Sequence, residues 1–243
     1  RPLSRGLGDV YKRQLLGLLM IHQLITLFMQ PKDKVVLFDL DGTLINSGLS
    51  FLKIVNEIKQ REGESSVDFE IVRKYSSRGA TLVLKNSFPD ASQEKISSLK
   101  SEFLSKYEKI MTSNIVKYDG VDKLLNYLTT KKIKWGIVTN KSAIYTIPII
   151  KKLNWHKLTT AIICPEDLNE VKPNPEGVFK GLELLNGDPQ QSYYVGDHHR
   201  DIETAHNAGV ISIACTYGYH ETDPNNWNAD HLVQKPSDIM EII

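Results

Sequence analysis

The sequence predicts an α/β fold in which a parallel sheet carries a helical insertion after its first strand. From Lys34 onward, short apolar runs alternate with segments of helical period, which is typical of βαβ units. Between Thr43 and Tyr118 this alternation stops, and only helical periods remain. The chain has 243 residues, of which 41% are hydrophobic, so it is long enough to bury one such core with an insertion.

The expected strands are short apolar runs rich in β-branched residues, as in strands that are covered on both faces. They are residues 35–38, 133–138, 161–163, 193–195 and 211–214. Helices are expected over 121–128 and 178–185, because apolar residues recur there at helical spacing. Pro175 before the second helix and Gly187 after it are typical of a helix start and a helix end.

Residues 47–117 form the expected insertion. Apolar residues recur at helical spacing at positions 49, 52, 55 and 58, and again at 96, 99, 103, 107 and 110. Ligands of open α/β sheets bind beyond the carboxyl ends of the strands, where an insertion after the first strand would lie. We therefore expect a small helical cap over the site, with residues 29–46 and 118–243 as the core.

The first 28 residues are unlike the rest of the chain. The apolar run 15–29 is interrupted by polar residues and is too short to span a bilayer. Lys12 and Arg13 precede it as in a signal peptide, but no small-residue cleavage site follows. The stretch GDVYKRQ resembles translated adapter sequence, and Met29 lies close before the first strand. We expect residues 1–28 to be a non-native or disordered leader and Met29 to be the natural start.

Charge and cysteine content exclude several classes of partner. The formal charge is +1, from 30 Lys and Arg against 29 Asp and Glu, so no basic surface for nucleic acid or an anionic membrane is expected. The two cysteines, Cys164 and Cys215, are too few for a disulfide framework or a four-ligand zinc site. A cytoplasmic protein, monomeric or homodimeric, is the expectation.

The net charge of residues 29–243 differs from that of the whole chain. Residues 1–28 contain four basic residues against Asp9 alone, so residues 29–243 carry a formal charge of −2. An anionic ligand would then need positive charge placed locally.

Polar residues lie at or just beyond the carboxyl ends of apolar runs in four places. Asp39 and Asp41 follow the first run, and their spacing to Gly42 excludes an EF-hand loop. Asp197 follows the run 193–195, with Asp201 four residues later, where it could also simply open a helix. Two carboxylates at each strand exit can serve a hard cation such as Mg²⁺.

The other two places offer groups for an anion. Thr139 and Asn140 follow the run 133–138, and Lys172 lies in a loop held by two prolines. Alone, the first pair is more often the N-cap of the next helix, and a lone lysine is usually a solvated surface residue. Together with the acids, at one edge of a sheet, they indicate phosphoryl transfer on a small phosphorylated metabolite.

In order and spacing, these segments resemble the four motifs of the haloacid dehalogenase superfamily. The matching residues are Asp39-x-Asp41-x-Thr43, Thr139, Lys172 and Gly196-Asp197-x-x-x-Asp201. The resemblance covers the chain from about Lys34 to the end and implies a Rossmann-like parallel sheet with a small helical cap.

The resemblance also implies a role for each residue. Asp39 would be the nucleophile that forms an aspartyl-phosphate, and Asp41 the general acid and then the base. Mg²⁺ would be held by Asp39, the backbone carbonyl of Asp41 and Asp197, with Asp201 as a ligand or support. The transferred phosphoryl group would be bound by Thr43, Thr139, Asn140 and Lys172, of which Lys172 also restrains the nucleophile.

Within the superfamily the chain is similar to the phosphoglycolate phosphatase group. It looks closest to the branch of N-acetylmuramic acid 6-phosphate phosphatases, through residues 135–141, Ile163-Cys164-Pro165 and the segment 217–230. In the cap, Arg78 and Gly79 lie where this group reads its substrate, and Arg78 could pair with a carboxylate. An exposed surface arginine is an equally good interpretation.

The sequence departs from the family pattern in two places, and it leaves two other functions open. Asn46 stands where the family commonly has Asp, and the pair His198 and His199 indicates either metal binding or an exposed loop. A phosphomutase of the β-phosphoglucomutase type shares all four motifs. A non-catalytic interaction module is disfavoured, because no motif acid is missing.

Overall fold

The computed structural model describes residues 15–18 and 32–243 of the chain. The expected leader, residues 1–28, lies outside the described residues except for 15–18, which form a short helical segment with Leu15, Leu16 and Leu18 exposed. Within the described part, no helix has the length and the apolar character that crossing a membrane requires. The remainder, from Asp33 to Ile243, is one compact unit.

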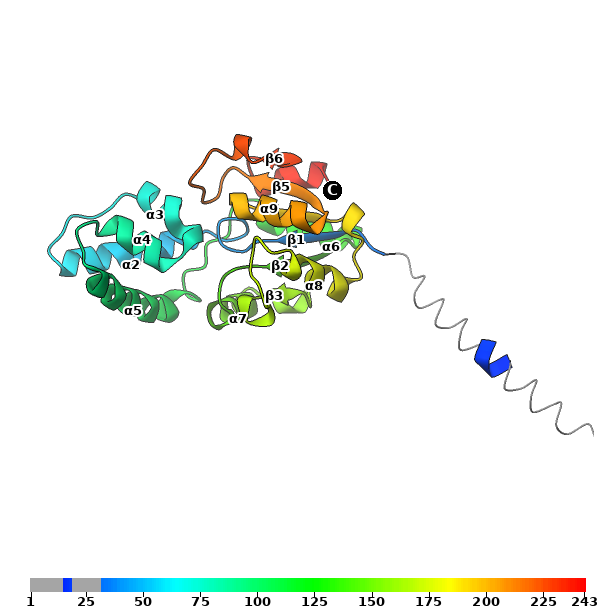
Figure 1. Ribbon diagram of the computed structural model, residues 1–243, viewed down its shortest axis with the longest axis horizontal. Helices are drawn as coiled ribbons and strands as arrows, with labels where there is room; N and C mark the ends of the chain where they lie inside the picture. Colours follow the sequence, from blue (N-terminus) through cyan, green and yellow to red (C-terminus); the bar gives the residue numbers. More distant parts are fainter. Residues whose placement is uncertain (1–14, 19–31) are drawn as a thin grey trace, which may run out of the picture. The chain divides into compact units, whose positions relative to one another are not determined.

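A six-stranded parallel sheet forms the core of this unit, in the order β3-β2-β1-β4-β5-β6 (Figure 1). The strands are β1 (Val35–Phe38), β2 (Lys134–Val138), β3 (Ile162–Ile163), β4 (Tyr193–Gly196), β5 (Ile211–Cys215) and β6 (His231–Val233). The five expected strands are all present. The edge strand β6 was not expected, because His231 and Leu232 are exposed and leave no apolar run.

Side chains of β1 alternate between the two faces of the sheet, and each face is covered by helices. Val36 and Phe38 pack with α6 (Val121–Lys131) and α7 (Ala143–Lys152). Val35 and Leu37 pack on the other face with α8 (Glu176–Leu185) and α9 (His199–Ala208). The sequence signal of β1 is therefore a continuous apolar run, as in a strand that is buried on both sides.

The helices expected over 121–128 and 178–185 are α6 and α8. The helix α8 ends at Leu185 as expected, but the residue that terminates it is Asn186, in the left-handed conformation with φ of 55°, rather than Gly187. Asn tolerates this conformation better than most residues, so the helix ends there without a glycine.

Four helices form the cap, which leaves the core directly after β1 (Figure 1). They are α2 (Gly48–Arg61), α3 (Phe69–Tyr75), α4 (Ala80–Ser87) and α5 (Gln93–Ile110). In α5 the expected positions 96, 99, 103 and 107 are buried. In α2 the buried face differs from the expected one: Phe51 and Ile54 are buried with Val55 and Ile58, whereas Leu49 is exposed. The rings of Phe51 and Phe103 meet edge to face between the two helices, 5.1 Å apart. The short helices α3 and α4 were not expected individually, since each is too short to show a clear period.

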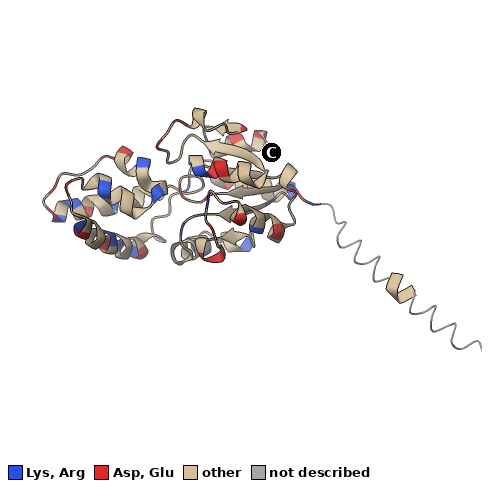
Figure 2. Ribbon diagram, in the orientation of Figure 1, with Lys and Arg blue, Asp and Glu red and all other residues tan. Residues whose placement is uncertain are grey.

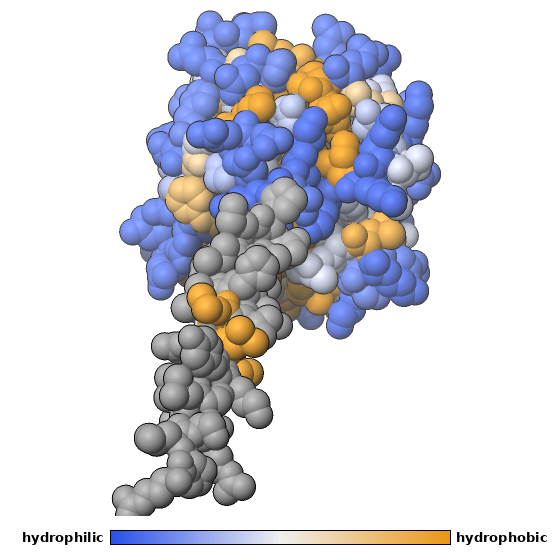
Figure 3. Space-filling model, turned by 90° about the vertical axis from the view of Figure 1, so that its right-hand side faces the viewer, coloured by the Kyte–Doolittle hydropathy of each residue, from blue (hydrophilic) through white to orange (hydrophobic). Residues whose placement is uncertain are grey.

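Surface charge is mixed rather than segregated. Figure 2 shows basic and acidic residues interspersed over the cap and the core. Figure 3 views the molecule from the right-hand side of Figure 1, and the described residues visible there are mostly hydrophilic, with small separate apolar patches. The described surface visible in Figure 3 thus has no broad apolar face.

Candidate active site

The register of the sheet brings the motif residues to one edge. Phe38 pairs with Ile137 of β2 and with Val195 of β4, so these three strands end almost level. Asp39 comes directly after β1, Thr139 directly after β2, and Asp197 directly after β4. Residues more than 150 positions apart in the chain thereby share one site.

Three acids at this edge form a compact buried cluster. Single carboxylate oxygens of Asp39, Asp197 and Asp201 lie within 4.8 Å of one another. The ammonium of Lys172 lies between two of them, 2.8 Å from Asp39 Oδ1 and 2.7 Å from Asp201 Oδ1. Only 3% of the Lys172 side chain is exposed, so it works here as a buried counter-charge.

The charges of this cluster do not balance. Burial raises the pKa of Asp39 and, together with the charges of Asp39 and Asp201, raises the pKa of Asp197 well above its usual range. Burial disfavours the charge of Lys172, but Asp201 and Asp39 outweigh it and raise the pKa of the ammonium. One cation thus faces three carboxylates, and buried charge without compensation is costly. The oxygen donor set and the excess negative charge both suit a hard divalent cation.

Asp197 is held in place by the backbone around it. It accepts hydrogen bonds from Thr43 Oγ1 at 2.9 Å and from the backbone N–H of Tyr219 at 2.7 Å. Gly42, with φ of 89°, and Gly218 pass so close that an added Cβ would lie 2.0 and 2.2 Å from Asp197 atoms. Thr43, expected among the phosphate ligands, is fully buried with its hydroxyl turned to Asp197.

The loop that carries Lys172 is hydrogen-bonded to Asn140, the residue after Thr139. Asn140 donates from Nδ2 to the Lys172 carbonyl, and Lys172 donates its N–H to Asn140 Oδ1, both at 3.2 Å. Thr139 Oγ1 accepts from the backbone N–H of Lys141 at 3.2 Å. The side chain of Asn140 therefore positions Lys172, while both residues line the same cavity as Thr139.

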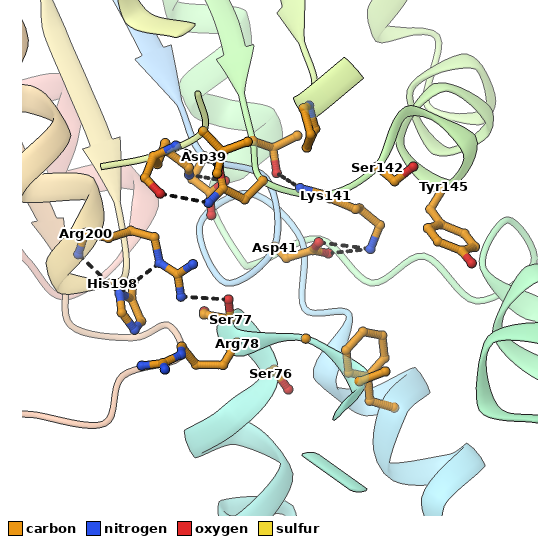
Figure 4. Close-up of a pocket in the computed structure, with 18 of the residues that line it drawn as sticks. Asp39, Asp41, Ser76, Ser77, Arg78, Lys141, Ser142, Tyr145, His198 and Arg200 are labelled. Carbon is orange, nitrogen blue, oxygen red and sulfur yellow. Dashed lines mark hydrogen bonds and ion pairs between the residues drawn. The ribbon is translucent and has the colours of Figure 1, made fainter. Parts of the chain in front are cut away.

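Asp41 has a partner of its own. Lys141 Nζ lies 3.1 and 2.9 Å from the two carboxylate oxygens of Asp41 (Figure 4). It also lies 2.8 Å from the hydroxyl of Tyr107 on α5. Burial disfavours the charge of Lys141, but Asp41 and Tyr107 raise its pKa overall. All three N–H groups of the ammonium are used, and the contact joins the core to the cap.

A cavity of about 450 Å³ lies between the cap and these residues. Its floor contains Asp39, Asp41 and Lys172, and its wall is aromatic, with Phe51, Phe103, Tyr107 and Tyr145 among the lining residues. Arg78 and Gly79 of the cap also line it. A concave, largely apolar space with a few convergent polar groups is typical of a small-molecule site.

Comparison with known proteins agrees with this geometry. Residues 36–215 match the family model described as haloacid dehalogenase-like hydrolase. The chain is a haloacid dehalogenase-like hydrolase. The expected superfamily and the α/β fold with a cap are thereby confirmed.

Several relatives of the hydrolase are phosphatases. It is 33% identical over 213 residues to an N-acetylmuramic acid 6-phosphate phosphatase from Pseudomonas putida, covering 86% of this chain and 96% of the relative. It is 35% identical over 205 residues to a phosphoglycolate phosphatase from Xylella fastidiosa, covering 84% and 90%. These relatives confirm the expected enzyme class, a phosphatase.

A solved structure shares the fold of the hydrolase. The crystal structure of a predicted phosphoglycolate phosphatase from Haemophilus somnus superposes with a TM-score of 0.76 at 24% identity. The match covers 88% of this chain and 99% of the other.

Some residues that line the cavity of the hydrolase were not predicted from the sequence motifs. Lys141 and Tyr107 beside Asp41, and Arg200 beside Asp201, all line the cavity. Lys141 carried a signal, because it directly follows Thr139 and Asn140 in the sequence. Tyr107 carried none beyond its place in an apolar helical period.

The two histidines and Asn46 have local partners in the hydrolase. His198 Nδ1 accepts from the N–H of Arg200 at 3.2 Å and so begins α9, while His199 is exposed. Burial, then the charges of Arg200, Lys172 and Arg78, lower the pKa of His198 to about 3, so it is neutral. Asn46 accepts from the hydroxyl of Tyr219 at 2.7 Å, at the start of the cap.

Proposed function

We propose that the hydrolase is a Mg²⁺-dependent phosphatase of N-acetylmuramic acid 6-phosphate that works through an aspartyl-phosphate on Asp39. The similarity to the Pseudomonas putida enzyme carries this proposal, because it extends over 96% of that relative. Such an activity would belong to peptidoglycan recycling.

The cavity supports a large leaving group. A volume of about 450 Å³ exceeds what the two carbons of phosphoglycolate would fill, whereas a substituted sugar would occupy most of it. The aromatic wall formed by Phe51, Phe103 and Tyr145 suits the apolar face of a sugar ring. Arg78 supplies positive charge on the cap side, which suits the carboxylate of a muramic acid.

Asp39, Asp197 and the backbone carbonyl of Asp41 would hold Mg²⁺, with Asp201 as a further ligand or support. The acidic oxygen donors fit this ion, and their excess negative charge supplies the electrostatic reason for binding it. When bound, the ion would neutralise charge on the phosphoryl oxygens.

The side chains divide the reaction between them. The Asp39 carboxylate attacks phosphorus while the leaving alkoxide takes a proton from Asp41. Asp41 then accepts a proton from the water that hydrolyses the aspartyl-phosphate and releases phosphate. Lys172, 2.8 Å from Asp39, restrains the nucleophile and, with Thr139, balances the charge of the phosphoryl group.

Phosphoglycolate is the second candidate substrate, favoured by the Xylella fastidiosa relative and equally able to use Arg78. A phosphomutase is third. It would require an aspartyl-phosphate that resists water, and stimulation by an added bisphosphorylated sugar.

A substrate comparison with the full chain tests the proposal. Phosphate release should be measured with Mg²⁺ and N-acetylmuramic acid 6-phosphate, phosphoglycolate or glucose 6-phosphate. We expect kcat/KM for the muramic acid to exceed the others by more than about tenfold, about 1.4 kcal/mol in transition-state binding. A tenfold preference for phosphoglycolate instead would contradict the proposed substrate.

A further inference from the structure

Arg200 is an unusual residue for its place in the fold. It lies in the first turn of α9, where the helix dipole favours acids and disfavours cations. Lys172 already supplies a cation to the neighbouring Asp201. A second cation here therefore costs stability unless an anion compensates it.

Within the described residues, no acidic side chain contacts the guanidinium of Arg200. Its guanidinium donates from Nη2 to the carbonyl of Ser77 at 3.0 Å and from Nε to His198 Nδ1 at 3.2 Å. Neither acceptor is a carboxylate: one is a backbone carbonyl oxygen and the other is an imidazole nitrogen. Lys141 and Lys172, by contrast, each have a carboxylate partner within 3.1 Å.

The guanidinium of Arg200 lies on the cap side of the cavity. Arg200 lines the cavity, and its bond to Ser77 draws it toward the cap loop that also carries Arg78 (Figure 4). Arg78 has only a long, half-exposed contact of 3.5 Å with Glu221. Two guanidinium groups that lack a close carboxylate partner therefore line the same end of the cavity.

We propose that Arg200, assisted by Arg78, binds a carboxylate on the leaving group and selects phosphomonoesters that carry one. A guanidinium offers a carboxylate two parallel N–H donors, which an ammonium cannot match. The hydrogen bond from Arg200 to Ser77 links α9 of the core to the cap segment that carries Arg78. This inference rests on the proposed phosphatase function and adds a residue that recognises the substrate's acid group.

The test uses pairs of substrates that differ in the carboxylate. N-acetylglucosamine 6-phosphate is the muramic acid substrate without its lactyl ether, and 2-hydroxyethyl phosphate is the neutral counterpart of phosphoglycolate. The full-length wild type and the variants Arg200→Gln and Arg200→Lys should be assayed with both pairs. Arg61→Gln, which removes an exposed arginine that pairs with Glu102 on the cap surface, is the matched control.

We expect Arg200→Gln to lower kcat/KM at least about tenfold for the acidic member of the pair that the enzyme uses, and by less than about threefold for the neutral member. Arg200→Lys should retain part of the preference, and Arg61→Gln all of it. Activity on the neutral member shows that each variant is folded.

Other results would overturn the inference in recognisable ways. An equal loss on both members would show that Arg200 serves the phosphoryl group or the loop rather than the carboxylate. No loss, or a wild type that does not distinguish the members of either pair, would overturn the inference and leave the phosphatase assignment intact. A wild type inactive on every phosphomonoester would overturn the proposed function itself.

Discussion

Each acid of the site has its own partners, and these partners separate the proposed roles. Asp39 and Asp201 share Lys172, whereas Asp197 is held by a hydroxyl and a backbone N–H. Asp41 alone is paired with Lys141. Lys172 thus holds the proposed nucleophile and Asp201, Thr43 and Tyr219 hold Asp197, and Lys141 holds the proposed acid and base.

Lys141 is predicted to position Asp41. In Lys141→Met the carboxylate loses the cation that contacts both its oxygens, so kcat/KM for an alkyl phosphate should fall about tenfold to hundredfold. An aryl phosphate with a good leaving group needs little proton donation and should lose much less. Steady-state assays on both substrates measure the difference. Lys180→Met, which changes an exposed lysine of α8, serves as control; equal losses on both substrates would refute the prediction.

The motif acids could be predicted from sequence because strand ends in a parallel sheet share an edge. Asp39 and Asp197 each follow a buried run directly, so the pattern alone placed them together. Tyr107 and Arg200 could not be placed, because their roles depend on how the cap meets the core. Thr43 shows the converse, since its motif position is clear but its hydroxyl turns to Asp197.

At the scale of elements, strong periods predicted structure and weak ones did not. The buried strands and the longer helices have apolar patterns that their packing requires. The strand β6 and the helices α3 and α4 are short or half-exposed, and contacts with their neighbours decide their conformation. Local sequence is a weak signal in such elements.

The helix α7 provides a test of stability at this scale. Its N-cap residue Ser142 makes no side-chain cap bond, and Glu166 instead accepts from the N–H of Ala143 at 2.9 Å. Glu166→Ala should therefore lower the free energy of unfolding by about 0.5 to 1 kcal/mol near pH 7. Glu183→Ala, on an exposed part of α8, is the control and should have little effect.

The effect of Glu166 should depend on pH. Hydrogen bonds from Ser142 and Ala143 lower its pKa below the ordinary 4.5. Its contribution is thus complete above pH 4.5 and is lost as the pH falls through the lowered pKa. Denaturant titrations of the variant and the wild type across this range measure the difference, and a difference independent of pH would speak against the carboxylate as the cap.

At the scale of the whole molecule, cap and core enclose one cavity in which the charges are concentrated. Residues 29–243 carry a formal charge of −2, so binding an anion was expected to need local cations. Lys172 and Arg78 were expected there, and the structure adds Lys141 and Arg200. The cap supplies Arg78 and Tyr107, so residues of both parts line the cavity.

Metal binding should stabilise the whole fold, because it relieves the repulsion among Asp39, Asp197 and Asp201. Mg²⁺ at about a hundred times its Kd should add about 2.7 kcal/mol, a rise of several degrees in Tm. Thermal unfolding with Mg²⁺, and with NaCl at equal ionic strength, measures this. Asp197→Asn should remove most of the shift; an unchanged shift in that variant would place the ion elsewhere.

In the proposed mechanism, Asp39 is the nucleophile of a phosphatase. The most direct measurement compares Asp39→Asn with the wild type, purified identically, for phosphate release from N-acetylmuramic acid 6-phosphate in the presence of Mg²⁺. The amide retains the size of the side chain but cannot attack phosphorus, so we predict a native circular dichroism spectrum and no release above the blank. Full activity in the folded variant would contradict the role of Asp39 as the nucleophile.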